Sequence, residues 1–357
     1  MKVVILSLAS RFGDTTGDCV QAEKTAEALR QLGVDVSRRF LDGSRIFDEG
    51  GQDCGVWSDA LSDCDIVHAI PPIPWTYLSR QLPVPAKFVV STVFWRSLAY
   101  VRVVHRARGR LSWQLIKEYG RVFLSWLGFP TYRSYQGYDL LLPNSEDEIK
   151  NFKSFCRTKS NSLFRAVPNA IDPIPDFVES LPRPEVVPTE DYIVVPAVFA
   201  ARKNHIAFIE AAKELPYPIV FMGDGEFFEK CQKIANHKMN FLGYVKHGSS
   251  LFYAVLKFAR VVCLPSNCET PGIAGLEAAA LGARPVIPYE GGTSQYYGWD
   301  AEYLNPLNAD SMRSALVRAW ERGRLSPQNR LKYRGLTWRR VAERTMEAYI
   351  ALVEKQK

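Results

Sequence analysis

Short apolar runs alternate with amphipathic stretches along almost the whole chain. The apolar runs at 3–9, 65–70, 87–93, 139–142 and 164–167 are typical of buried strands, and the amphipathic patterns at 19–32 and 145–155 are typical of helices between them. The alternation resumes at 191–199 and continues to about residue 321. Because strands in parallel sheets are covered on both faces and read as continuous apolar runs, we expect an α/β fold with doubly wound parallel sheets.

A proline-rich segment divides this pattern into two halves of similar size. Residues 172–190 contain five prolines, and such a segment is extended and hard to include in a core. A chain of 357 residues also exceeds what one core usually serves. We therefore predict a Rossmann-like domain over 1–175, a linker over 176–190 that acts as a hinge, and a second Rossmann-like domain over 191–337. The helical pattern at 338–357 is expected to pack across the domain junction.

The composition is that of an ordinary globular enzyme, with 47% apolar and 23% charged residues. No apolar run reaches the roughly 18 residues of a membrane span. The apolar start of the chain is soon followed by Arg11, Asp14 and Asp18, so a first strand is favoured over a signal peptide. The seven cysteines are an odd number without a CxxC pair, which argues against a disulfide framework or a zinc site. We expect a cytoplasmic protein.

The positive charge is concentrated in one segment. Residues 96–133 contain seven arginines and one lysine against a single acid, Glu118, and this net charge of +7 equals that of the whole chain. Leu111, Leu115, Tyr119, Val122 and Trp126 fall on one helical stripe. One interpretation is an amphipathic helix packed on the core with a solvated basic face. The other is a surface that meets anionic lipid or a lipid-diphosphate acceptor. Nucleic acid is disfavoured because the rest of the chain is not basic.

The segment from Glu269 to Glu277 carries the strongest chemical signal. Its two carboxylates lie eight residues apart around a Pro-Gly turn, with an apolar strand at 260–265 before them and a small-residue helix at 273–281 after them. The amides at the helix start would face an anion, usually phosphate, and they belong to Gly272, Ile273 and Ala274. Carboxylates on both sides are strong acceptors for hydroxyl groups. A phosphate flanked by hydroxyl groups describes a nucleotide sugar.

Several motifs resemble those of the family-4 glycosyltransferases, which have the two-Rossmann GT-B architecture with a cleft between the domains. The resemblance is strongest in the pair Glu269 and Glu277 and extends to the stretches at 221–225, 240–244 and 291–293. In the first half it includes 142–145, 167–172 and the loop around Gly17, which is similar to that of bacterial surface-polysaccharide assembly members. The resemblance implies a retaining, metal-independent glycosyltransferase of the hexosyltransferase type. Its donor would be a nucleotide-diphosphate sugar and its acceptor a glycan or a lipid-linked sugar.

The resemblance also implies roles for individual residues. Glu269 would hold hydroxyls of the transferred sugar and Glu277 those of the ribose, while Lys203, with Arg202 beside it, would neutralise the diphosphate. The second domain, 191–337, would thus bind the donor, and the first domain, 1–175, the acceptor. The helix at 338–357 resembles the family's C-terminal helix, which returns to the first domain. The remaining predicted donor contacts are Gly17 in the first loop, Thr270, Pro271, Gly272, Ile273 and Ala274 at the turn, and Gly243 and Tyr244 beside the base. No metal or cofactor is expected, and no Asp-x-Asp motif stands in a donor position.

Three positions depart from the family pattern and leave alternatives open. Val198 stands where an arginine is usual, Ile70 where many members have a catalytic-site histidine, and Gln295 where an acid is often found. His68, two positions earlier, is either a catalytic residue or a core histidine. The Gly223-Asp-Gly225 stretch has Phe228 in place of a third glycine, which favours a tight turn over a nicotinamide site. The alternatives to a glycosyltransferase are a nucleotide-sugar epimerase of the same fold and a cytoplasmic pseudoenzyme that binds the donor without turnover. If the protein is the enzyme, the basic segment 96–133 could hold it at the inner face of a membrane.

Overall fold

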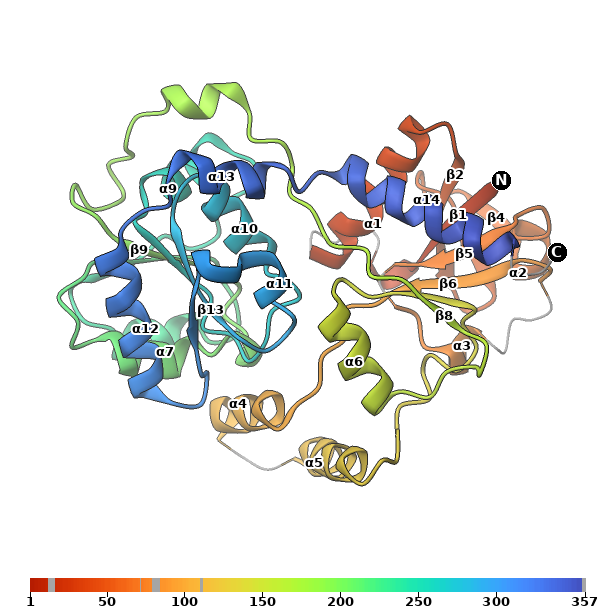
Figure 1. Ribbon diagram of the computed structural model, residues 1–357, viewed down its shortest axis with the longest axis horizontal. Coiled ribbons are helices and arrows are strands. Elements are labelled where there is room, and N and C mark those ends of the chain that lie inside the picture. Colours follow the sequence, from red (N-terminus) through yellow and green to blue (C-terminus); the bar gives the residue numbers. More distant parts are fainter. Residues whose placement is uncertain (12–16, 71, 79–83, 110–111, 355–357) are drawn as a thin grey trace. The chain divides into compact units, whose positions relative to one another are not determined.

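The computed structural model describes residues 1–11, 17–70, 72–78, 84–109 and 112–354, without the side chains of Arg11, Asp18 and Thr76. The chain divides into two compact units (Figure 1). The first unit contains residues 1–94, 121–170 and 337–357, and the second contains 95–120 and 171–336. Each unit is built on its own sheet, which confirms the prediction of two parallel-sheet α/β domains.

The sheet of the first unit is parallel except at one edge. Its strand order is β4-β3-β2-β1-β5-β6-β7-β8, and only the β2–β3 and β3–β4 pairs are antiparallel. The strands are β4 (Asp53–Val56), β3 (Arg45–Phe47), β2 (Asp35–Asp42), β1 (Lys2–Leu8), β5 (Ile66–Ala69), β6 (Lys87–Ser91), β7 (Leu140–Leu142) and β8 (Leu163–Phe164). The antiparallel hairpin was not predicted, because β3 and β4 are short and have no buried apolar run.

Helices cover the first sheet on both faces. On one face α1 (Gly17–Gln31) and α14 (Trp338–Glu354) pack on Val3, Ile5 and Val89. Tyr349 of α14 is fully buried there, so the C-terminal helix belongs to the core of this unit. The opposite face carries an aromatic cluster in which Phe88 stacks on Trp57 with ring centroids 6.3 Å apart. The other helices of this part are α2 (Trp57–Ala60), α3 (Trp75–Leu78) and α6 (Glu146–Phe155), with the short 3-10 turn η1 (Ala9–Arg11).

The sheet of the second unit is entirely parallel and has the order β11-β10-β9-β12-β13-β14. In chain order this is 3-2-1-4-5-6, the arrangement of a dinucleotide-binding fold. The strands are β9 (Ile193–Pro196), β10 (Ile219–Met222), β11 (Met239–Phe241), β12 (Val261–Cys263), β13 (Arg284–Pro288) and β14 (Glu302–Leu304). Successive residues of β9 enter different cores, Ile193 one and Val194 the other, so both faces of the sheet are buried.

The helices of the second unit divide between the two faces of its sheet. The core that contains Phe208 and Met312 brings α7 (His205–Ala212), α8 (Phe228–Ile234) and α12 (Ala309–Arg322) to one face. The core that contains Leu256 and Ala278 brings α9 (Ser250–Phe258) and α10 (Ile273–Ala280) to the other. Further short elements are α11 (Ser294–Tyr297), α13 (Pro327–Arg334), η3 (Ala201–Lys203) and η4 (Gly298–Asp300).

One segment that follows β6 in the chain packs with the second unit. The helix α4 (Leu98–Arg108) lies against η3, and Arg106 donates a hydrogen bond to the carbonyl of Leu307 at 3.3 Å. The indole of Trp95 donates to Glu290 at 2.5 Å. Residues 95–120 therefore belong to the second unit, although they lie within the predicted 1–175 domain in the sequence. Their contacts are with the second unit.

The proline-rich segment also packs with the second unit. The 3-10 turn η2 (Asp176–Ser180) buries Val178 completely, and Val187 is almost as buried in the same core. The ammonium of Lys257 donates to the carbonyls of Glu179 at 2.7 Å and Leu181 at 3.0 Å. Residues 176–190 thus differ from the free linker that was predicted, because two valines between the prolines fill the core. The structure places the change of unit at 170–171.

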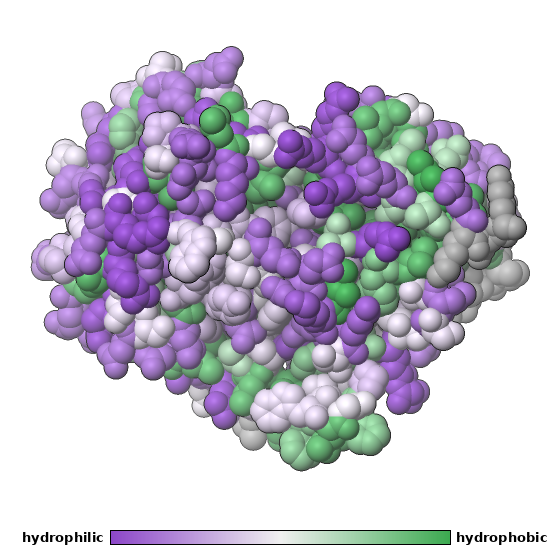
Figure 2. Space-filling view, viewed as in Figure 1, coloured by the Kyte–Doolittle hydropathy of each residue, from purple (hydrophilic) through white to green (hydrophobic). Residues whose placement is uncertain are grey.

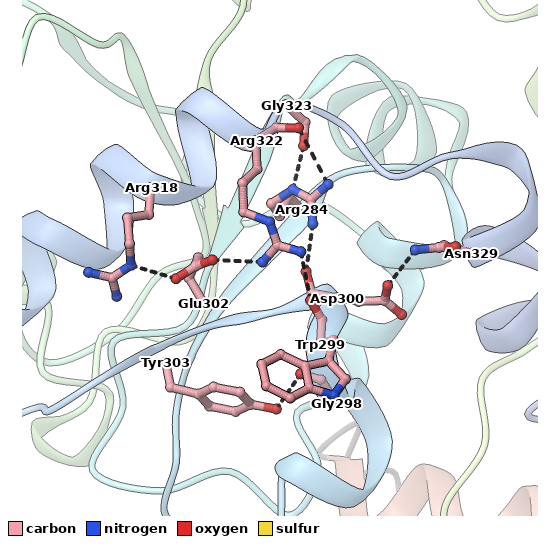
Figure 3. A network of polar contacts seen from close by, with 10 residues as sticks. All are labelled: Arg284, Gly298, Trp299, Asp300, Glu302, Tyr303, Arg318, Arg322, Gly323 and Asn329. Atoms are coloured by element: carbon pink, nitrogen blue, oxygen red, sulfur yellow. Dashed lines mark hydrogen bonds and ion pairs between the residues drawn. The ribbon is translucent and has the colours of Figure 1, made fainter.

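A network of arginine contacts fixes the far edge of the second sheet (Figure 3). Arg284, at the start of β13, is buried and donates to the carbonyls of Gly323 at 2.5 Å and Asp300 at 3.0 Å. In the same network Glu302 of β14 accepts hydrogen bonds from Arg318 and Arg322 of α12. The guanidinium groups satisfy carbonyls at element ends, so the network is structural and holds β13, β14 and α12 in register.

The helix α5 (Trp113–Trp126) was predicted to bury one stripe and to expose a basic face. Leu115 and Val122 are indeed buried, with exposures of 6% and 2%. Trp126, the last residue of the helix and one turn after Val122 on the same stripe, is 68% exposed. The outward side of α5 is largely apolar instead of basic.

A buried carboxylate links two strand ends in the first unit. Glu148 of α6 is fully buried and accepts hydrogen bonds from the Thr92 hydroxyl at 2.6 Å and from the amides of Phe94 at 2.9 Å and Asn144 at 2.8 Å. These contacts join the loops that follow β6 and β7. Burial raises the pKa of Glu148 to about 7, although its three hydrogen-bond donors act in the opposite direction.

The raised pKa of Glu148 predicts a pH dependence of stability. Because the folded pKa lies above the ordinary value of 4.5, this side chain stabilises the fold fully below pH 4.5, and the contribution is lost as the pH rises through about 7. We expect the unfolding free energy of the wild type to lose roughly 3 kcal/mol over this window relative to Glu148→Gln. Urea denaturation at a series of pH values measures the difference. Glu146→Gln, in the exposed first turn of the same helix, is the control and should keep the wild-type slope. Equal slopes for wild type and Glu148→Gln would contradict the prediction.

Candidate functional site

The predicted donor residues follow strands of the second unit at one edge of its sheet. Lys203 follows β9, Gly243 follows β11, and Glu269 follows β12. In the strand order, β9 and β12 are neighbours although the chain visits β10 and β11 between them. This is the topological switch point, where the loops leave the sheet in opposite directions and ligands of such folds bind beyond the carboxyl ends of the strands.

Lys203 and Glu269 meet at this switch point. The Lys203 ammonium lies 2.5 Å from Glu269 Oε1, and the Ser266 hydroxyl donates to the same oxygen at 2.5 Å. The pair is largely shielded, with side-chain exposures of 12% for Lys203 and 7% for Glu269. A shielded ion pair beside open backbone amides can exchange partners when an anion or a hydroxyl group enters. The structure therefore brings together the two residues that were predicted to hold the diphosphate and the transferred sugar.

The start of α10 presents backbone amides next to this pair. The first turn of any helix leaves its N–H groups without helical partners. Within the described part of the chain no side chain caps this helix, whose N-cap residue is Gly272 with φ of +83°. Tyr297 fixes the turn by donating to the carbonyls of Pro271 at 3.2 Å and Gly272 at 3.0 Å. Gly272, Ile273 and Ala274 are partly exposed while the rest of the helix is buried. The turn thus offers an anion site.

The second predicted carboxylate, Glu277, is paired with a histidine. Glu277 is 2% exposed, and its Oε1 lies 2.6 Å from Nε2 of His247, whose side chain is 48% exposed. The ring of His247 packs edge-on against Phe252, with centroids 4.8 Å apart. Burial raises the pKa of Glu277, and the contact with His247 lowers it in part. A half-exposed imidazole that orients a buried carboxylate is suited to a polar ligand group such as a sugar hydroxyl.

The loop after β13 packs against the backbone of Glu269. The amide of Glu269 donates to the carbonyl of Glu290 at 3.1 Å. Gly291, with φ of +108°, lies so close that a Cβ atom on it would stand 1.9 Å from the carbonyl oxygen of Glu269. Only glycine combines this backbone conformation with this approach. The Gly-Gly-Thr stretch, which contributed to the family resemblance, therefore serves to position Glu269.

The other predicted donor residues are placed as follows. Arg202 is exposed, and its carbonyl accepts a hydrogen bond from the amide of Asn267 at 2.9 Å. Tyr244 is 70% exposed beside Gly243, whose φ is +70°. Thr270 and Pro271 form the turn before α10 and are joined by a cis peptide bond. Gly17 begins α1 in the first unit and is exposed. The loop before it, at 12–16, lies outside the described residues.

His68, the second predicted catalytic residue, lies in the core of the first unit. It is fully buried in β5, with Nδ1 2.6 Å from the Tyr349 hydroxyl and Nε2 2.9 Å from the Ser91 hydroxyl. Burial lowers the pKa of His68 to about 3, so the ring is neutral. Both nitrogens have protein partners, and neither is open to a ligand. This placement favours the core alternative over the catalytic one, and Ile70 is likewise buried.

A cavity of about 260 Å³ in the second unit lies apart from the two carboxylates. It is bordered by α4, η3 and the start of α7. Its lining consists of five alanines, Ile206 and Phe227, together with the polar residues Arg106, Asn204, His205 and Glu210. Of the predicted site residues, neither Glu269 nor Glu277 lines it. The candidate site is therefore the switch point, where the ion pair, the amides and the second carboxylate gather.

The sequence did not indicate Ser266, His247 or Trp95 as parts of this region. Ser266 lies three residues before Glu269, and His247 lies in the loop that follows β11. Both residues could have been found from the rule that loops at the carboxyl ends of parallel strands converge. Trp95 carried no such signal, because it precedes a helix in the other half of the chain.

Comparisons with known proteins agree with this picture. Residues 178–330 match the family model described as "Glycosyl transferases group 1". No curated protein matches. Among solved structures, the chain is similar to a sucrose-phosphate synthase from Thermosynechococcus elongatus (15% identity, 99% of this chain and 100% of the other, TM-score 0.69). It is also similar to the lipopolysaccharide outer core galactosyltransferase WaaB (13%, 98% and 99%, TM-score 0.65) and to Anabaena Alr3699/HepE in complex with UDP and glucose (13%, 98% and 100%, TM-score 0.62).

The identities to these structures are low, so they establish the fold, and the family match adds the chemical class. The matched range includes every switch-point residue described above, from Lys203 to Gly291. The match of residues 178–330 to the group 1 model, together with the fold, confirms the prediction that the chain is a glycosyltransferase.

Proposed function

We propose that this protein is a retaining, metal-independent glycosyltransferase that takes a sugar from a nucleotide-diphosphate sugar. The observation that carries the proposal is the convergence of the Lys203–Glu269 pair and the open first turn of α10 at the switch point. One cation and several amides suit a diphosphate, and a carboxylate on each side suits hydroxyl groups. HepE, a neighbour of this fold, is described in complex with UDP-glucose, which supports a nucleotide sugar as the donor.

In this proposal the residues act by binding and by stabilising the leaving group. The bond between the sugar and the diphosphate breaks as the acceptor oxygen bonds to the same carbon, and the acceptor proton leaves with the diphosphate or to solvent. Negative charge then develops on the diphosphate, next to Lys203 and the amides of Gly272 to Ala274. Fixed charges and dipoles aimed at a leaving group lower the barrier without reorganisation. The family resemblance implies that the sugar carbon keeps its configuration, because the acceptor attacks on the face from which the leaving group departs.

The residues at the switch point suit a site that works without a metal ion. The described residues contain no cluster of three or more His, Cys, Asp or Glu side chains that would hold a metal. Glu269 is engaged by Lys203 and Ser266, and Glu277 by His247. Lys203 would take the place of a divalent cation beside the diphosphate. The acceptor in this proposal is a glycan or a lipid-linked sugar of surface polysaccharide synthesis, used at the cytoplasmic side.

The proposal is tested by thermal unfolding with nucleosides, nucleoside diphosphates and nucleotide sugars, with and without a chelator. A ligand at a hundred times its dissociation constant stabilises the protein by about 2.7 kcal/mol. We expect a shift for the diphosphate and the nucleotide sugar of one base, unchanged by the chelator. In Lys203→Ala the shift with the diphosphate should fall while that with the nucleoside remains.

Three results would contradict parts of this proposal. A shift that disappears with the chelator would exclude metal independence. Equal loss of nucleoside and diphosphate binding in Lys203→Ala would show that this side chain does not contact the phosphates. The absence of any shift would exclude nucleotide-sugar binding. If a nucleotide sugar does bind, an assay of its turnover separates the alternatives. An epimerase converts the donor without an acceptor, and a pseudoenzyme neither transfers nor hydrolyses it.

A further inference from the structure

The outward side of α5 carries an unusual concentration of large apolar residues. Seven of the twenty exposed large hydrophobic residues of the described chain lie between 113 and 129. They are Trp113, Ile116, Phe123, Leu124, Trp126, Leu127 and Phe129, here called the α5 face. Figure 2 shows hydrophobic residues gathered over this helix at the lower edge of the view. Single exposed apolar residues are ordinary, but a contiguous set marks a surface that meets another apolar medium.

The α5 face is not a misplaced core side of the helix. Leu115 and Val122 already provide the inward contacts, and both are buried. The outward aromatic side chains are exposed by 58% at Phe123, 68% at Trp126 and 59% at Phe129. The helix therefore has two apolar sides, of which only one is used by the fold.

The charges next to the α5 face are positive. His105 of α4 lies 3.3 Å from the Tyr119 hydroxyl of α5, so the two helices are neighbours. On α4 the side chains of Arg102, Arg106 and Arg108 are exposed, and Lys117 is exposed on α5. The single acid of residues 96–133, Glu118, has a side-chain exposure of 15% and lies 3.7 Å from Arg96. The exposed charge around the α5 face is thus complementary to an anionic surface.

The dimensions of α5 decide how such a surface would be met. Its 14 residues give a length of about 21 Å, against roughly 30 Å for the hydrocarbon core of a bilayer. No helix in the described part of the chain is long and apolar enough to cross a membrane. Tryptophan and phenylalanine on one side with lysine and arginine beside them are typical of a helix that lies in the plane of the interface.

We propose that the α5 face docks this protein on an anionic lipid bilayer, with its aromatic side chains in the acyl boundary and the arginines of α4 at the headgroups. Lys117 supports this arrangement, because its ammonium lies 5.6 Å from the centroid of the Trp113 ring, at the border of the apolar and polar surfaces. The proposal concerns a surface and is independent of the donor site. It places the catalytic domain beside a bilayer, where a lipid-linked acceptor would be present.

The experiment is flotation of the full chain with vesicles of phosphatidylcholine alone and with phosphatidylglycerol added. We expect binding to the anionic vesicles, part of which persists in 0.5 M salt, because insertion of apolar groups is not screened. The double variant Phe123→Glu, Trp126→Glu should bind about tenfold or more weakly. Trp299→Glu is the matched control: this tryptophan is 95% exposed on η4 of the second unit, and its loss should leave vesicle binding unchanged.

The possible outcomes separate membrane docking from its competitors. If the double variant binds vesicles as the wild type does, or if the wild type ignores them, the proposal is overturned. Sedimentation velocity without lipid tests the alternative that the α5 face binds a second copy of the chain. A wild-type dimer that the double variant converts to a monomer would assign the α5 face to self-association instead. A wild-type monomer that binds anionic vesicles, with loss in the double variant only, supports the proposal.

Discussion

Replacing Glu269 by alanine is expected to reduce sugar transfer by about a hundredfold or more in kcat/KM while nucleoside diphosphate binding is kept. The carboxylate would hold the transferred sugar, so its loss removes contacts that orient the reacting carbon. The same change frees Lys203, whose ammonium lies 2.5 Å from Glu269 Oε1, and leaves its charge available to the diphosphate. Steady-state kinetics with the identified donor, together with calorimetric titration of the diphosphate, measure the two effects.

An exposed ion pair of the same unit provides the control for Glu269→Ala. Glu210 and Lys213 lie 2.7 Å apart, with side-chain exposures of 49% and 40%. Such a pair contributes little, so Glu210→Ala should leave both kinetics and stability within experimental error. Transfer at the wild-type rate by Glu269→Ala would remove Glu269 from the site. A parallel loss of diphosphate binding would show that the residue supports the fold of the turn and not the sugar alone.

Replacing Gly291 by alanine is expected to be the most damaging single-methyl change in this region. The added Cβ atom would lie 1.9 Å from the carbonyl oxygen of Glu269, and the backbone φ of +108° is unfavourable for any other residue. We expect a loss of roughly 3 kcal/mol or more in unfolding free energy, because overpacking and backbone strain add. Transfer should fall as well, since the clash displaces Glu269. Urea denaturation and kinetics on the same preparation measure both.

Gly33→Ala is the matched comparison for this change. Gly33 also has a positive φ, +81°, but a Cβ atom there would meet nothing within 4 Å. Its substitution therefore reports backbone strain alone, about 1–2 kcal/mol. If the two variants lose the same unfolding free energy, the close approach of Gly291 to Glu269 contributes nothing to the loss in Gly291→Ala.

The pattern of apolar runs predicted the sheets well where both faces are buried. The predicted strands at 3–9, 65–70 and 87–93 correspond to β1, β5 and β6, and the predicted helix at 19–32 to α1. The pattern was less informative where contacts are long-range. The antiparallel edge of β3 and β4 depends on a hairpin without an apolar run. The placement of 95–120 and of the proline-rich segment depends on side chains that pack on the second unit, such as Val178.

The candidate site was predictable to the extent that it lies on one turn and one helix start. Spacing alone placed Glu269, Glu277 and the amides between them on one strand-turn-helix unit, as the structure has them. The partners come from other loops: Lys203 follows β9, and His247 follows β11. Their distances require the strand order, which periodicity does not contain. For His68, a strand-end position does not separate a cleft from a core, and the contact with Tyr349 comes from the opposite end of the chain.

The position of residues 95–120 has a consequence for recombination between related enzymes. A chimera joined at residue 171 would carry Lys203, Glu269 and Glu277 from one parent and would keep the apparent donor half intact. It would, however, inherit from the other parent the tryptophan position that contacts Glu290 and the helix that covers η3. Exchange of the donor half as a functional module therefore requires four crossovers. Two of them bracket residues 95–120, one lies at 171, and one lies before 337 because the C-terminal helix belongs to the first unit.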